Sequence, residues 1–95
     1  MSKKSFIYII GNGKDLKLGV SVKPEKRIKQ LQTGSSQSLE LVEKYCLPAE
    51  LVYNLEKQCH EELNHYYKKR GEWFSNADPW HVKVIIEEIC EKHLN

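Results

Sequence analysis

The chain has 95 residues, of which 40% are hydrophobic and 29% are charged, and its formal net charge is +2 at pH 7. This globular balance excludes a disordered chain, and the length predicts one domain spanning residues 1–95. The longest apolar run, Phe6–Ile10, cannot cross a bilayer and no signal-peptide core follows Lys3 and Lys4, so we expect a cytoplasmic protein with no membrane partner.

The first predicted elements are two strands joined by a tight turn. Ser5–Ile10 is rich in β-branched and aromatic residues, and a second strand is expected near Leu16–Val20. Asn12-Gly13 lies between them and is the strongest short hairpin signal, because both central residues of a type I′ turn need a positive φ. The two strands therefore predict a β-hairpin.

A two-residue turn also predicts the register of this hairpin. Tyr8 would face Lys17 across the strands, and Ile9 would face Leu16. Paired residues of this kind have Cβ atoms about 4.5–5.5 Å apart, so the phenol and the ammonium are expected to be neighbours. The same register gives one coherent apolar face made of Ile7, Ile9, Leu16 and Leu18.

The rest of the chain predicts helices around a third strand. Pro24 suits the first position of a helix that continues through Glu25–Leu31, and Leu39–Leu47 alternates like a strand. An amphipathic helix is expected from Pro48 or Ala49 to about Lys69.

The C-terminal region predicts a short apolar segment and a last helix. Glu72-Trp73-Phe74 is expected to form a brief strand or a packed loop, and Trp80 to help close the core. Asp78-Pro79 is a good cap and first residue for an amphipathic helix that buries Val82, Ile85, Ile86 and Ile89.

Positive charge is concentrated at the N-terminal end. Residues 1–35 hold eight Lys or Arg residues against two acidic ones, whereas residues 36–95 hold seven against eleven. Such an asymmetry is typical of a surface that meets a nucleic-acid backbone, although scattered lysines also simply solvate exposed faces. The candidate nucleic-acid contacts are Lys14, Lys23, Lys26 and Lys29.

The three cysteines argue against a disulfide framework or a zinc ribbon. Cys46, Cys59 and Cys90 are odd in number, widely spaced and contain no CxxC pair. Cysteine is among the residues most often buried, so we expect free thiols in a reducing compartment.

Several short motifs occur in a characteristic order over about residues 6–76. They are Phe6-Ile7-Tyr8, Lys17-Leu18-Gly19, Arg27 in a helix that runs into Leu31-Gln32-Thr33, Leu55-Glu56-Lys57 with His60, and Gly71-Glu72-Trp73-Phe74. Together they resemble the GIY-YIG nucleases, and most closely their small phage-type subfamily. The resemblance implies an α+β fold with a three-stranded antiparallel sheet flanked by helices, and a phage or bacterial origin.

The resemblance also implies catalytic roles. Tyr8 matches the catalytic tyrosine of the first motif, Arg27 matches the catalytic arginine, and Glu56 matches the glutamate that holds one Mg²⁺ or Mn²⁺ ion. Three positions depart from the pattern or match it loosely. Lys17 stands where many members have a second tyrosine, Phe6 replaces a glycine, and Asn76 is a loose candidate for the late asparagine.

These residue types suit phosphodiester hydrolysis. Tyr8 would take a proton from water, and an ammonium at Lys17 would favour the phenolate or orient the water. A guanidinium at Arg27 would hold the phosphate at two points, and a carboxylate at Glu56 is a hard ligand for Mg²⁺. His60, four residues after Glu56, lies on the same helix face and would orient Glu56, touch a phosphate or simply lie beside the site.

The leading hypothesis is therefore a metal-dependent DNA endonuclease that acts on double-stranded or branched DNA. Because 95 residues leave no room for a separate recognition domain, we expect one of four solutions to target choice. The protein would cut with little sequence preference, act as a homodimer, read branched or single-stranded structure, or take its specificity from a protein partner. The alternatives are a nucleic-acid-binding module without catalysis and a phage or mobile-element regulator on the same fold. The sequence assigns no physical role to Glu72.

Overall fold

A computed structural model describes residues 3–94 as an α+β fold, which confirms the predicted class. The elements in chain order are β1 (Lys4–Gly11), β2 (Leu16–Ser21), α1 (Pro24–Thr33), β3 (Glu40–Pro48), α2 (Ala49–Leu63), β4 (Lys69–Arg70), β5 (Trp73–Phe74) and α3 (Pro79–Cys90).

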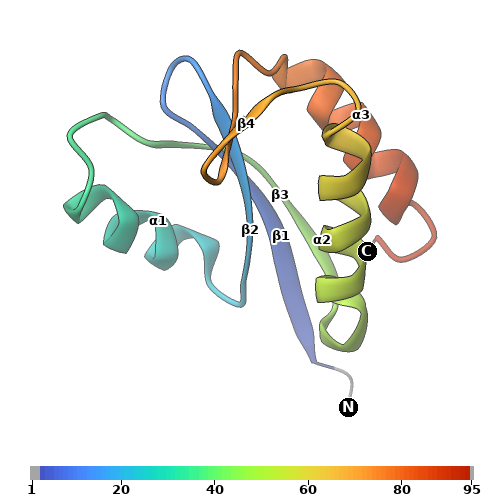
Figure 1. Cartoon of the computed structure of the whole chain (residues 1–95). Helices are drawn as coiled ribbons and strands as arrows, with labels where there is room; N and C mark the ends of the chain where they lie inside the picture. The colour runs from blue at the N-terminus through green and yellow to red at the C-terminus, as the bar shows by residue number, and fades with distance from the viewer. Residues whose placement is uncertain (1–2, 95) are drawn as a thin grey trace.

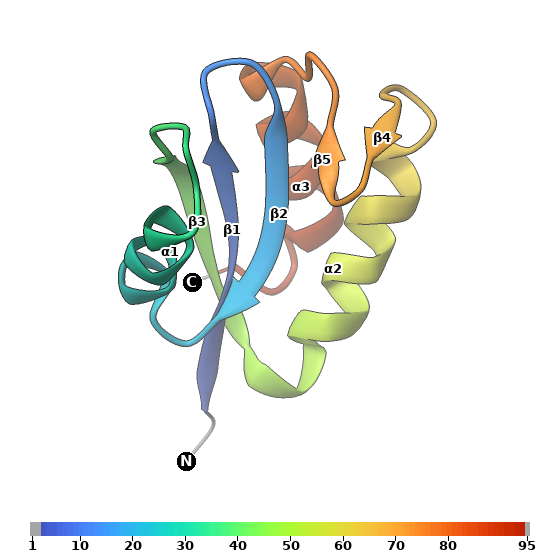
Figure 2. The same cartoon turned by 60° about the vertical axis from the view of Figure 1, so that its left-hand side comes forward.

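The strands form one antiparallel sheet in the order β3-β1-β2-β5-β4. The three long strands are those expected from the sequence, and the two-residue strands β5 and β4 extend the sheet beside β2 (Figure 2). Helix α1 lies on one side of the sheet, and α2 and α3 lie on the other (Figure 1). The sheet therefore has two faces with different neighbours.

The main core lies between the sheet and the pair α2 and α3. The apolar face predicted for the hairpin is confirmed, since Ile7, Ile9, Leu16 and Leu18 are at most 4% exposed. The core also takes side chains from both helices and from β3 and β5, namely Leu47, Val52, Leu55, Cys59, Leu63, Phe74, Val82, Ile86 and Cys90. None of the helices in residues 3–94 offers the apolar length that a bilayer requires.

The register of the β1–β2 hairpin differs from the predicted one by two residues. Tyr8 pairs with Gly19 and Lys17 pairs with Ile10, so the expectation that Tyr8 faces Lys17 was wrong. Because side chains alternate with a period of two, this shift leaves every residue on its predicted face. Tyr8 and Lys17 are diagonal neighbours on the face that α1 covers.

The side chain of Asn12 explains the longer turn. Its Oδ1 accepts hydrogen bonds from the backbone N–H groups of Lys14 (3.0 Å) and Asp15 (2.8 Å). Among the described residues only Asn76 and two glycines, Gly13 among them, have a positive φ, so Asn12 does not adopt the conformation that a type I′ turn requires. A side chain that competes for backbone donors has replaced the two-residue turn with a four-residue one.

Gly19 is required by the ring of Tyr8. A Cβ atom built on Gly19 would lie 2.3 Å from both the Cζ and the hydroxyl oxygen of Tyr8, which is far inside van der Waals contact. The tip of the tyrosine ring therefore lies directly over the backbone of β2. Gly19 is not among the glycines with a positive φ, so a glycine is needed here for close packing and not for backbone conformation.

Two expectations for the C-terminal half are corrected. Helix α2 ends at Leu63, and the following residues turn into β4, so Lys69 is on a strand instead of the helix. Trp80 does not close the core, since it is 71% exposed. The predicted cap is confirmed, because the carboxylate of Asp78 accepts a hydrogen bond from the Trp80 N–H at 3.0 Å.

The contact between Tyr8 and Gly19 gives a first prediction. Gly19→Ala should lower the free energy of unfolding by about 1–3 kcal/mol, because the added methyl group forces the ring or the strand to move. Urea unfolding followed by circular dichroism measures this change. Gly34→Ala is the matched control, since its Cβ meets only Leu31 O at 3.9 Å and should leave stability nearly unchanged. Equal stabilities of the two variants would contradict the assignment.

Candidate active site

The candidate site lies along the outer edge of β2. Strand β5 pairs with β2 only at Leu16, through Phe74, so Lys17–Ser21 has no strand partner on its outer side among the described residues. Lys17, Gly19 and Ser21 alternate onto the face that carries Tyr8. About 7 Å separates each of these positions from the next along the strand.

The phenol of Tyr8 reaches solvent without an internal partner. The residue as a whole is 3% exposed, and its hydroxyl makes no hydrogen bond to any described residue. In residues 3–94, the only fully buried side-chain oxygen or nitrogen without a hydrogen-bond partner is Ser75 Oγ. The unbonded hydroxyl of Tyr8 is therefore not fully buried and keeps contact with water. A buried ring that presents an unbonded hydroxyl at a strand edge is suited to act on a bound molecule.

Lys17 is held by an acidic residue from the β4–β5 hairpin. Its Nζ lies 3.0 Å from a carboxylate oxygen of Glu72, and the side chains are 15% and 76% exposed, respectively. The hydrogen bond and charge of Lys17 hold the pKa of Glu72 below its usual range, and the charges of Lys69 and Arg27 act in the same direction. Glu72, which had no assigned role, is therefore the partner of Lys17.

Arg27 lines an open basic groove between the end of β2 and α1. The groove has a volume of about 360 Å³ and contains Lys23 and Lys26 as its other charged residues. It begins at Ser21, on the face that carries Tyr8. No acidic side chain lines it.

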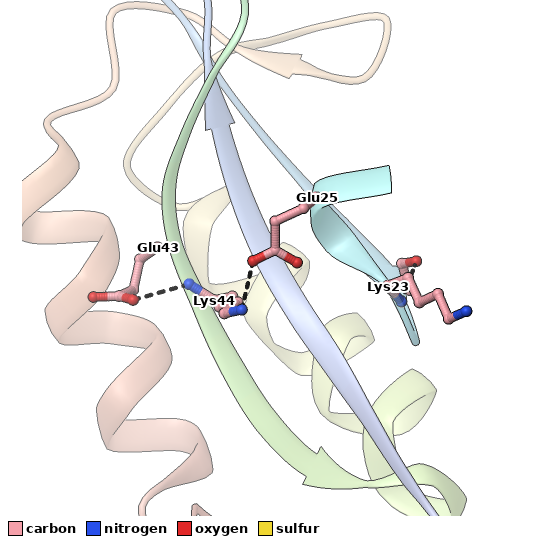
Figure 3. A network of polar contacts seen from close by, with 5 residues as sticks. Lys23, Glu25, Glu43 and Lys44 are labelled. Atoms are coloured by element: carbon pink, nitrogen blue, oxygen red, sulfur yellow. Dashed lines mark hydrogen bonds and ion pairs between the residues drawn. The ribbon is translucent and has the colours of Figure 1, made fainter. Parts of the chain in front are cut away.

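The acidic residue nearest to this groove in sequence is already paired. Glu25 forms an ion pair with Lys44 of β3, whereas the side chain of Lys23 points away from that pair (Figure 3). The hydrogen bond from Lys44 lowers the pKa of Glu25. This contact also ties the start of α1 to the sheet, so that Arg27 is carried by an anchored helix.

Glu56 and His60 lie on the side of α2 next to the β4–β5 hairpin. His60 Nδ1 accepts a hydrogen bond from Lys69 Nζ at 3.2 Å, because an ammonium group can only donate. The imidazole Nε2 then carries the proton and faces Glu56 Oε2 at 3.6 Å. The His60 ring also packs on Phe74, with 5.5 Å between ring centroids. His60 is therefore held on two sides and oriented toward Glu56.

Residues 3–94 contain no group of three or more His, Cys, Asp or Glu side chains arranged to hold a metal ion. Glu56 is 21% exposed, and its only ion-pair partner among these residues is His60. One accessible carboxylate fits a Mg²⁺ or Mn²⁺ ion that keeps most of its ligands as water and substrate oxygens. The donor set does not fit a metal held by the protein alone.

Other candidates lie apart from this edge. Lys14 lies in the β1–β2 turn beside a second cavity of about 430 Å³, whereas Lys23 follows the far end of the six-residue strand β2, about 20 Å away. Lys29 is exposed on α1. Asn76 donates its backbone N–H to Asp15 at 2.9 Å and so supports the β1–β2 turn.

Phe6 also has a different cross-strand partner from the one that the predicted hairpin register implies, which is Gly19. It pairs with Ser21 instead of Gly19, and the ammonium of Lys44 lies 5.3 Å from its ring centroid. No described contact joins the hydroxyl of Tyr8 to Lys17, Arg27 or Glu56 in the free protein.

Sequence reasoning missed Lys69 and the partner of Glu72. The long-helix prediction placed Lys69 on α2, although the following Gly71, with φ +59°, marks a tight turn. Arg70 pairs with Trp73, which leaves Gly71-Glu72 as a two-residue hairpin turn. Reading that turn from the sequence would have placed Lys69 on the first strand of the hairpin, opposite Phe74, and Glu72 at its tip.

Comparison with known families identifies the class of the protein. The T5orf172 domain family matches residues 5–91, and the chain therefore belongs to this nuclease-like family. No curated protein and no solved structure matches the chain significantly.

The Lys17–Glu72 pair predicts a titration shift. In Lys17→Met the pKa of Glu72 should rise toward the ordinary carboxyl value, because its strongest partner is gone. NMR titration of the Glu72 side-chain carboxyl measures this, with Lys29→Met as the control. The wild-type pair is intact above the ordinary carboxyl pKa, and its small stabilising effect is lost as the pH falls through the lowered pKa. An unshifted Glu72 in Lys17→Met would contradict the pairing.

Proposed function

We propose that the protein is a metal-dependent DNA endonuclease that hydrolyses phosphodiester bonds at the edge of β2. The observation that carries the proposal is the unbonded hydroxyl of Tyr8, which lies over Gly19 on the same face as Lys17 and the start of the Arg27 groove. Membership of a nuclease-like family supports phosphodiester hydrolysis as the reaction.

The reaction needs a base, a phosphate clamp and charge stabilisation. Tyr8 takes a proton from a water molecule, whose oxygen forms a bond to phosphorus while the bond from phosphorus to the leaving 3′ oxygen breaks. The products are a 5′-phosphate and a 3′-hydroxyl, which takes its proton from solvent. The guanidinium of Arg27 contacts the non-bridging oxygens at two points, and Lys17 adds positive charge near the phenol.

Glu56 is the proposed metal ligand. His60 packs on Phe74, and Phe74 pairs with Leu16 at the start of β2. Helix α2 and strand β2 run in opposite directions (Figure 2), so the step back along α2 from His60 to Glu56 runs the same way as the step along β2 from Leu16 toward Gly19. That step is about one helical turn, or about 5.4 Å, which equals the length of about two strand residues. This geometry supports a position for Glu56 beside the stretch of β2 that Tyr8 covers. When bound, Mg²⁺ or Mn²⁺ supplies Lewis-acid stabilisation of charge on the phosphate oxygens.

The basic groove supports DNA as the substrate. Lys23 and Lys26 line it together with Arg27, and the neighbouring acid Glu25 is neutralised by Lys44. Cations without counter-ions release condensed ions from a nucleic-acid backbone when they bind it. Double-stranded or branched DNA would follow this groove, and a second copy of the chain or a protein partner would supply target choice.

A second candidate function is nucleic-acid binding without cleavage. It is favoured by the lysine at position 17, where many GIY-YIG nucleases have a tyrosine, and by the lack of a contact between Tyr8 and Glu56 in the free protein. In this case the groove would bind DNA in a salt-dependent way, and no divalent metal would produce cleavage. A regulator that binds a host protein would instead show no affinity for DNA.

Nicking of supercoiled plasmid in Mg²⁺ or Mn²⁺ tests the endonuclease proposal. Tyr8→Phe and Glu56→Gln should each lower the nicking rate about 100-fold or more, and EDTA should abolish nicking. Tyr53→Phe and Glu50→Gln are matched controls, because both residues are exposed on α2. Nicking that survives in both site variants would refute the mechanism. DNA binding without nicking by wild-type protein would establish the second candidate.

A further inference from the structure

Glu72 is an exposed acid that lies against a half-buried cation. Its side chain is 76% exposed at the tip of the β4–β5 hairpin, yet it reaches 3.0 Å from the ammonium of Lys17, which is only 15% exposed. The hairpin has strands of two residues each and pairs with β2 only at Leu16. The carboxylate is therefore presented to the edge of β2 by a small and weakly attached element.

Cations from three elements act on this carboxylate. Lys17 comes from β2, Lys69 from the hairpin itself and Arg27 from α1, and the charge of each lowers the pKa of Glu72. All three belong to the proposed catalytic set or adjoin it, since Lys17 and Arg27 are members and Lys69 donates to His60. Three positive side chains that converge without an anion would repel one another.

A carboxylate and a phosphodiester present the same chemistry to such cations, namely anionic oxygens that accept charge-assisted hydrogen bonds. The acid is exposed, and an exposed ion pair contributes little to stability, so its displacement is easy. A backbone phosphate that contacts the ammonium of Lys17 meets the position that Glu72 holds.

We propose that Glu72 occupies a phosphate-binding position in the DNA-free protein and is displaced when nucleic acid binds. The inference rests on the proposed function, because it takes nucleic acid as the ligand. Glu72 would then compete with nucleic-acid phosphates for Lys17. In the DNA-free protein it holds Lys17 in place and keeps weakly binding ligands away from the edge of β2.

Binding of a fluorescein-labelled DNA duplex, followed by anisotropy in EDTA so that no cleavage occurs, tests the inference. Glu72→Gln should bind about fivefold or more tightly than Glu61→Gln, an exposed acid on α2 that makes no ion pair among the described residues. Both variants change the net charge equally. The slope of log affinity against log salt should steepen by about one for Glu72→Gln, as expected when one more phosphate is contacted.

The double variant Lys17→Met/Glu72→Gln separates competition from a general charge effect. Its affinity should fall back to that of Lys17→Met alone, because the freed cation is absent. Equal affinities of Glu72→Gln and Glu61→Gln, or weaker binding by a folded Glu72→Gln, would overturn the inference and leave the proposed function standing. Absence of binding by wild type and by every variant would overturn both.

Discussion

The contact between the ring of Tyr8 and the backbone of Gly19 determines where the Tyr8 hydroxyl lies in this molecule. The strand that carries Tyr8 lies in the middle of the sheet, where a hydroxyl group would ordinarily be covered. Because position 19 has no side chain, the ring extends across β2 and brings its hydroxyl to the sheet edge. A methyl group at that position is incompatible with this arrangement.

The edge of β2 joins the two faces of the sheet. Helix α1 supplies a guanidinium and lysines from one side, and α2 supplies a carboxylate and an imidazole from the other. The short β4–β5 hairpin covers only the first residue of β2, and it contacts β2 through Glu72 and Lys17 and α2 through Lys69 and His60. The hairpin thus organises the site without closing it.

The elements could be predicted from the sequence wherever burial decided the outcome. The apolar stripes of the strands and of α3, and the Asp78-Pro79 cap, were sufficient because local pattern and tertiary packing agree there. The hairpin register was not predictable from the Asn12-Gly13 pair alone, since the Asn12 side chain bonds its own backbone instead of entering a type I′ turn.

The sequence supplied candidate site residues but not their contacts. Family motifs named Tyr8, Lys17, Arg27 and Glu56, and the chain belongs to a nuclease-like family. The link between Lys17 and Glu72 depends on a hairpin of two-residue strands, which has too little hydrophobic pattern to be recognised. Trp80 was assigned to the core because its size favours burial, although the first turn of α3 faces solvent there.

The central claim is that the carboxylate of Glu56 on α2 and the phenol of Tyr8 on β1 act on the same phosphate group, which lies at the edge of β2. Mn²⁺ titration of the Tyr8→Phe protein with a DNA duplex, followed by NMR line broadening, tests it most directly. The account predicts broadening of the amide signals of Glu56, His60 and Lys17–Gly19 together, and its loss in the additional Glu56→Gln variant. Broadening at α2 that leaves Lys17–Gly19 sharp, or that survives removal of the Glu56 carboxylate, would contradict it.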